Sequence, residues 1–212
     1  MAYRLKGKGI KIISNAIYIG APGWLCISDN KEFILLDGNT TKQEVDLFLF
    51  GIFIYNSSIC ITDNSSESLQ NLLDAFNSDE VVLSGGPLFY ENDTRILPSC
   101  CCGLEQWHEV VTGICNKRNV WLGHDPFPVI EYGDNLTTIW SDDCLGIYGA
   151  AKPKDNLNSI EFLVDGLDCC LDKLRGDIKA FVTIPFCNRL NEIDHYMADD
   201  LMFAVMKWLN IA

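Results

Sequence analysis

The residues that could do chemistry in this chain gather first between positions 120 and 144. His124 and Asp125 are neighbours in a Gly-His-Asp-Pro sequence, and Asp142 and Asp143 follow in the same stretch. A general base needs an imidazole whose second nitrogen is held by a carboxylate. Neighbouring side chains seldom face each other, so Asp125 is expected to cap the turn and Asp142 or Asp143 to be the orienting acid. The simpler interpretation, which we favour, is a tight turn with a hydrogen-bonded histidine.

Three consecutive cysteines, followed by a histidine and another cysteine, form the second such cluster. Its candidate zinc ligands are Cys100, Cys102, His108 and Cys115. Structural zinc sites use Cys-x2-4-Cys pairs, because that spacing aims two thiolates at one ion. Cys101, His108 and Cys115 are instead seven positions apart, which on a helix separates neighbours by about 10 Å. The pattern therefore favours buried thiols over a zinc site, and it indicates no cofactor.

Two further enzyme-like arrangements also have simpler interpretations. With ten cysteines and three histidines, some cysteine–histidine pair is always imaginable, but the chain lacks a nucleophile signature such as Gly-x-Ser-x-Gly. The acidic pairs Asp199-Asp200 and Glu192 with Asp194 are most simply helix caps or turn residues. A small hydrolase that uses His124 with a nearby acid or cysteine is kept as an alternative function.

A β-hairpin is the element that would position the first cluster. Residues 127–132 and 136–140 are runs rich in aromatic and β-branched residues, and Gly-Asp-Asn joins them. Pairing of Pro128 near Trp140 would bring the two ends of the hairpin to one side. The His-Asp pair and the Asp-Asp pair would then lie close together.

The rest of the chain predicts strands first and helices later. Strands are expected at residues 9–19, 24–28, 32–36, 47–55, 58–62 and 160–164, with the apolar run 47–55 as a buried strand. Helices are expected at residues 65–77, 104–115 and 163–183 and from Met197 onward. Asn64 or Ser65 would cap the first helix, and Pro185 would end the third. Residues 85–87, Gly-Gly-Pro, are expected to form a turn, and residues 146–158 a loop.

This order of elements predicts an α+β fold. We expect an antiparallel, meandering sheet in the N-terminal and middle parts, with helices packed on it and two amphipathic helices at the C-terminus. The chain is interpreted as a single domain over residues 1–212. The alternative is a subdivision into a strand-rich half, 1–95, and a half with the hairpin and the later helices, 96–212.

The charge balance restricts the class of partner. Twenty-nine acidic residues face 16 basic ones, which gives a net charge of −13. Such a charge repels nucleic acid and anionic membranes, and it either favours a basic protein partner or serves only solubility. The N-terminus lacks the apolar segment of a secretory signal, and no apolar run is long enough for a bilayer. With that N-terminus, the many cysteines indicate reduced thiols and a cytoplasmic location.

The second half of the chain resembles a known class of protein. The residues that carry the likeness are Arg118, the run Trp-Leu-Gly-His-Asp-Pro at 121–126, the hairpin up to Trp140, and Ile-Glu-Phe at 160–162 before an amphipathic helix. This pattern resembles bacterial immunity proteins of polymorphic toxin systems, over residues 118–212 and without a specific family. The resemblance implies a cytosolic α+β protein that neutralises a toxin domain by binding it, rather than an enzyme.

The expected binding surface lies around the hairpin, where exposed aromatic side chains would be the anchors and acidic ones would attract a basic toxin domain. Its candidate residues are Trp121, His124, Asp125, Tyr132, Trp140, Asp142 and Asp143. A third alternative is a structural or assembly subunit, which would have a large apolar surface and form an obligate oligomer. The sequence leaves the oligomeric state open.

Overall fold

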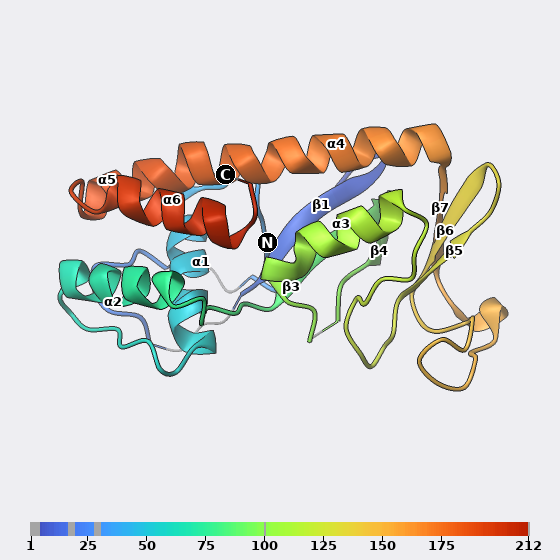
Figure 1. Ribbon diagram of the computed structural model, residues 1–212, viewed down its shortest axis with the longest axis horizontal. Coiled ribbons are helices and arrows are strands. Elements are labelled where there is room, and N and C mark those ends of the chain that lie inside the picture. Colours follow the sequence, from blue (N-terminus) through green and yellow to red (C-terminus); the bar gives the residue numbers. More distant parts are fainter. Residues whose placement is uncertain (1–4, 17–19, 28–30, 100, 212) are drawn as a thin grey trace. The chain divides into compact units, whose positions relative to one another are not determined.

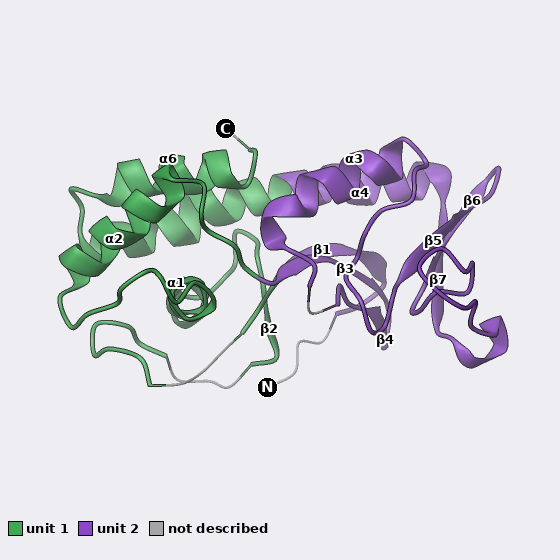
Figure 2. Ribbon diagram, turned by 60° about the horizontal axis from the view of Figure 1, so that its bottom comes forward, with its two compact units in different colours: residues 1, 13–83, 176–212 green, residues 2–12, 84–175 purple. Residues whose placement is uncertain are grey.

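The computed structural model describes residues 5–16, 20–27, 31–99 and 101–211, and within them the chain forms two compact units. Unit 1 contains residues 13–83 and 176–212, and unit 2 contains the described part of residues 2–12 together with 84–175 (Figure 2). Each unit combines helices with antiparallel strands, which confirms the α+β class (Figure 1). Over the described ranges, every helix is too short or too polar to cross a bilayer.

Unit 1 is mainly helical. Its bounds are α1 (Lys42–Tyr55), α2 (Ser65–Asn77), α5 (Cys187–Ile193), α6 (Ala198–Trp208) and the last part of α4 (Val164–Phe181). The end of β1 (Lys8–Asn15) pairs antiparallel with β2 (Phe33–Leu35). Phe48 of α1 packs edge-on against Phe181 and Phe186, with ring centroids 5.1 Å and 5.9 Å apart. Phe76 of α2 similarly packs against Trp208 of α6.

Helix α1 corrects the largest error of the sequence interpretation. Residues 47–55 were expected to be a buried strand, but they form the second part of this helix. A capping box starts it: the Thr41 side chain accepts from the Glu44 backbone N–H, and the Glu44 carboxylate accepts from the Thr41 N–H. The expected strands at residues 58–62 and 24–27 are also wrong, since both segments are turns and irregular chain. Residues 17–19 and Ser28, included in two expected strands, lie outside the described residues.

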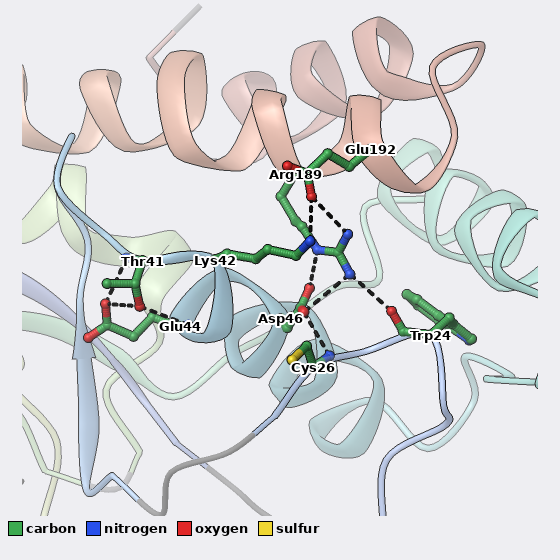
Figure 3. A network of polar contacts seen from close by, with 8 residues as sticks. All are labelled: Trp24, Cys26, Thr41, Lys42, Glu44, Asp46, Arg189 and Glu192. Carbon is green, nitrogen blue, oxygen red and sulfur yellow. Dashed lines mark hydrogen bonds and ion pairs between the residues drawn. The ribbon is translucent and has the colours of Figure 1, made fainter.

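An ion pair inside unit 1 explains why α1 can carry an acid in a buried position. Asp46 is fully buried, and its carboxylate accepts hydrogen bonds from Arg189 Nε at 2.6 Å and from the Cys26 backbone N–H at 2.8 Å (Figure 3). The Arg189 guanidinium also donates to the Trp24 carbonyl and contacts Glu192. The network therefore joins α1 to α5 and to the segment at residues 24–26.

The other helix predictions for unit 1 have mixed outcomes. The helix at residues 65–77 is confirmed as α2, and Asn64 caps it by accepting from the Ser66 and Glu67 N–H groups. Pro185 was expected to end the long C-terminal helix, and this is wrong. A π-helical turn, Val182–Phe186, accommodates the proline and leads directly into α5. The expected helix from Met197 is confirmed as α6, which buries Leu201 and Val205.

Unit 2 contains two groups of strands and one complete helix. β3 (Gly85–Glu91) and β4 (Thr94–Ile96) pair antiparallel, and the first part of β1 lies next to β3. β5 (Val129–Tyr132), β6 (Leu136–Trp140) and β7 (Ser159–Leu163) form an antiparallel meander. The expected helix at residues 104–115 is confirmed. It consists of a 3-10 turn, Leu104–Gln106, followed by α3 (Trp107–Cys115). The expected turn at residues 85–87 is wrong, because these residues begin β3.

The hairpin prediction is confirmed in unit 2. β5 and β6 pair with Val129 opposite Trp140, one residue from the expected partner Pro128. The Gly133 N–H closes the turn by donating to the Leu136 carbonyl at 2.8 Å. The hairpin therefore brings residues 127–128 and 141–143 to the same end of the meander, where the candidate site lies.

Candidate functional site

The loop after β6 is built around one buried carboxylate. Asp143 is 2% exposed, and its two oxygens accept from four backbone N–H groups further along the same loop. The donors are Leu145, Ile147, Tyr148 and Gly149, at 2.7–3.2 Å. Burial by itself raises the pKa of Asp143, but the amide hydrogen bonds outweigh it, so the pKa lies below its ordinary value. The side chain thus shapes the loop and is not presented at the surface.

Asp142 has a similar role one residue earlier. Its Oδ1 accepts from the Phe127 backbone N–H at 3.0 Å and from the Asp143 N–H at 2.8 Å. The carboxylate therefore fixes the chain that enters β5 to the chain that leaves β6. In the described structure neither Asp142 nor Asp143 contacts His124, so the expected orienting acid for a general base is not in place.

These two carboxylates support a cluster of four rings, Trp121, His124, Phe127 and Tyr148, which we call the ring cluster. Trp121 stacks on His124 with centroids 6.2 Å apart, and it meets Tyr148 edge-on at 5.1 Å. Phe127 stacks on Tyr148 at 5.7 Å. The Tyr148 hydroxyl donates to the Val120 carbonyl at 2.9 Å. Trp121 is 39% exposed and His124 is exposed too, so part of the cluster faces solvent.

The segment before α3 lies against the residues that carry the cluster. The Ser99 N–H donates to the Leu122 carbonyl at 2.7 Å, and the Ser99 hydroxyl donates to the Pro126 carbonyl. Gly123 permits this close approach, because its φ is +95° and a Cβ there would lie 2.8 Å from the Ser99 carbonyl oxygen. The same pairing places the thiol of Cys101 3.8 Å from His124 Nε2.

A cleft of about 440 Å³ adjoins the ring cluster, between α3 and residues 118–121. Its polar lining includes His108, Glu109 and Arg118, and Trp121 forms part of its wall. Gly113 allows this wall to approach the helix, since a Cβ there would lie 2.2 Å from Val120 Cγ1. The exposed tryptophan therefore has a hollow beside it that could admit a side chain of a partner.

The described members of the proposed zinc site, Cys102, His108 and Cys115, do not form a group. Among the described residues, no three His, Cys, Asp or Glu side chains are arranged to hold a metal ion. Cys102 is fully buried, and burial, followed by the nearby Glu105, raises the pKa of its thiol to about 12. Cys115 is exposed and contacts Arg175 at 3.6 Å. The thiols of this cluster were expected to be buried, and among its described members this holds for Cys102 alone. Cys101 is exposed, as Cys115 is, and Cys100 lies outside the described residues.

The remaining predicted binding residues are placed in three different ways. Asp125 is exposed and follows His124 with a φ of +51°. Tyr132 is half-buried and donates its hydroxyl hydrogen bond to the Arg118 carbonyl, and burial raises its pKa. Trp140 donates to Glu131 and lies under the Lys154 ammonium, which is 4.9 Å from its ring centroid. Trp121, His124 and Asp125 are therefore the predicted residues that share one exposed stretch.

No protein-family model, curated protein or solved structure matches this chain. The site is accordingly interpreted from its own geometry.

The sequence interpretation did not include three residues that shape the site. Tyr148 and Phe127 complete the ring cluster, and Ser99 connects it to the cysteine-rich segment. Phe127 could have been found, because it opens the predicted hairpin. For Tyr148, a loop with two glycines close after Asp143 was a weak signal for a carboxylate-bound turn.

Proposed function

We propose that this chain is a protein-binding module that recognises a basic protein partner through the ring cluster of unit 2, as a toxin-neutralising immunity protein would. The observation that carries the proposal is the partly exposed Trp121, stacked in a cluster whose backbone is fixed by Asp142 and Asp143. Tryptophan is one of the residue types enriched among the side chains that contribute most to binding at protein interfaces. Little conformational entropy is lost when such a pre-organised ring is buried.

The electrostatic part of the proposal comes from the whole chain and from Asp125. A net charge of −13 attracts a basic partner and accelerates its association at low salt. Asp142 and Asp143 are engaged in local hydrogen bonds, so we assign the direct acidic contact to the exposed Asp125 instead. The resulting complex would be sensitive to salt in its association rate more than in its dissociation rate.

The experiment is co-expression of the chain with the protein encoded beside it, followed by size exclusion and a titration. Replacement of Trp121 by Ala should weaken the complex by about 30-fold, the effect of losing an interface anchor worth about 2 kcal/mol. Phe203→Ala is the matched control, because Phe203 is a 60% exposed aromatic residue of unit 1. Equal losses for the two variants, or no complex with the neighbouring protein and no protection of host cells, would contradict the proposal.

The hydrolase alternative has less support from the geometry. The expected acid–base arrangement relied on Asp142 or Asp143 to orient the ring of His124. Both acids that were expected to do this are occupied by backbone N–H groups. The alternative also allowed a cysteine beside His124, and Cys101 lies 3.8 Å from its Nε2.

A further inference from the structure

Cys101 and His124 are 23 positions apart in the chain, yet their side chains meet at the surface of unit 2. Cys101 Sγ lies 3.8 Å from His124 Nε2, within reach of a hydrogen bond to sulfur, and both residues are exposed. The contact depends on backbone pairing of Ser99 with Leu122 and on the absence of a side chain at Gly123. It is therefore held by the fold of the segment and not by the two side chains alone.

We propose that Cys101 is a nucleophilic thiol that undergoes thiol–disulfide exchange with small disulfides, with His124 as the proton acceptor. An imidazole beside a thiol favours the thiolate, which is the form that attacks a disulfide. The surface position of Cys101 gives such a reagent access. His124 also belongs to the ring cluster, but the exchange reaction needs no bound partner, so it can be tested on the chain alone.

The reaction can be written so that every atom is accounted for. His124 Nε2 takes the thiol proton, and the Cys101 thiolate attacks one sulfur of a disulfide R–S–S–R. A bond between Cys101 Sγ and that sulfur forms while the original S–S bond breaks. The departing R–S⁻ recovers the proton from the imidazolium and leaves as R–SH. Cys101 is oxidised, the leaving sulfur is reduced, and the disulfide itself is the oxidant.

The other thiols of the chain provide the comparison. Cys102 is buried and its raised pKa disfavours the thiolate, so the next residue in the chain should be inert. Cys26, Cys60 and Cys169 are exposed like Cys101. Among the described cysteines, Cys101 is the one that lies within hydrogen-bond reach of an imidazole. Cys115 contacts the Arg175 guanidinium and is therefore not a neutral standard.

The test uses the full chain with glutathione disulfide at pH 7 and follows each cysteine by mass spectrometry. Fragmentation of the peptide that contains Cys100, Cys101 and Cys102 shows which of the three cysteines carries the mixed disulfide. Cys101 should form the mixed disulfide about tenfold faster than Cys60, since only a few per cent of an ordinary thiol is ionised at this pH. The advantage should shrink above about pH 8.5, where ordinary thiols ionise as well.

Two histidine variants distinguish the effect of the His124 imidazole from the effect of the solvent accessibility of the Cys101 thiol. His124→Gln should slow Cys101 to the rate of Cys60, whereas His195→Gln, a change in unit 1, should leave the rate of Cys101 unchanged. Protection of Cys102 in the His124 variant reports that the segment is still folded. The proposal is overturned if wild-type Cys101 reacts no faster than Cys60, or if His124→Gln leaves its rate unaltered while Cys102 remains protected.

Discussion

Each unit of this protein contains a buried aspartate, and the two are stabilised in opposite ways. Asp46 in unit 1 is 0% exposed and is paired with Arg189, a residue 143 positions away. Asp143 in unit 2 is 2% exposed and accepts from backbone N–H groups no more than six positions away. The first acid connects separate helices, and the second shapes one loop. A buried charge can thus secure either tertiary packing or the local form of a surface, depending on where its donors come from.

The largest expected effect follows from removing the guanidinium in unit 1. Arg189→Met should lower the free energy of unfolding of unit 1 by about 3–5 kcal/mol, because Asp46 would remain buried without its counter-charge. Urea denaturation monitored by circular dichroism measures it. The double variant Asp46→Leu/Arg189→Met should recover part of the loss, since no unpaired charge is left. A single-variant loss below about 1 kcal/mol would show that Asp46 does not depend on this partner.

Removing the charge in unit 2 should have a smaller and more local effect. Asp143→Asn should lower the free energy of unfolding by about 2–3 kcal/mol. The amide NH₂ of asparagine cannot accept the hydrogen bonds that the backbone N–H groups donate to a carboxylate oxygen. Hydrogen exchange should accelerate in residues 145–149 and remain unchanged in α1. Asp155→Asn, at an exposed position of the neighbouring 3-10 turn, is the control and should have no such effect. Faster exchange in α1 as well would contradict the local role assigned to Asp143.

Acid should weaken the loop that Asp143 holds in unit 2. The native pKa of Asp143 is lowered, so its contribution to stability is complete above the unfolded value of about 3.9 and is lost as pH falls through the native pKa. The protection of residues 145–149, measured as the exchange rate relative to the intrinsic rate at the same pH, should therefore fall below about pH 4 in the wild type. Asp143→Asn should lack that part of the pH dependence. An identical acid profile for both proteins would show that the loop is held by other groups.

The sequence predicted those elements whose signals are local. Asn64 before a periodic apolar pattern placed α2, and Gly-Asp-Asn between β-branched runs placed the β5–β6 hairpin. Helix α1 was missed because its apolar run was taken without Thr41 and Glu44, a capping box that the sequence does contain. Its buried acid is explained by Arg189, which periodicity cannot connect to it.

The site was predictable to a similar extent. Trp121, His124 and Asp125 belong to one short stretch, so their proximity could be inferred from the sequence. The contact of Cys101 with His124 depends on pairing of Ser99 with Leu122, two irregular segments without a periodic pattern. The burial of Asp143 depends on a loop that folds back on it. Acidic residues are seldom fully buried unless they are paired, and the sequence does not show the backbone donors of Asp143. Asp143 was therefore predicted to lie at the surface.

The smallest expected effect concerns an exposed ion pair, in contrast to the two buried aspartates. Glu131 and Lys154 form an ion pair at 2.7 Å, with side chains 40% and 45% exposed. The hydrogen bond from Lys154 lowers the pKa of Glu131, yet solvent and salt screen such exposed pairs. Lys154→Met should therefore leave the thermal midpoint in 0.5 M salt within error of the wild type. A loss as large as that of Asp143→Asn would mean that the ammonium over Trp140 supports the meander itself, and local stabilisation in unit 2 would then extend beyond one carboxylate.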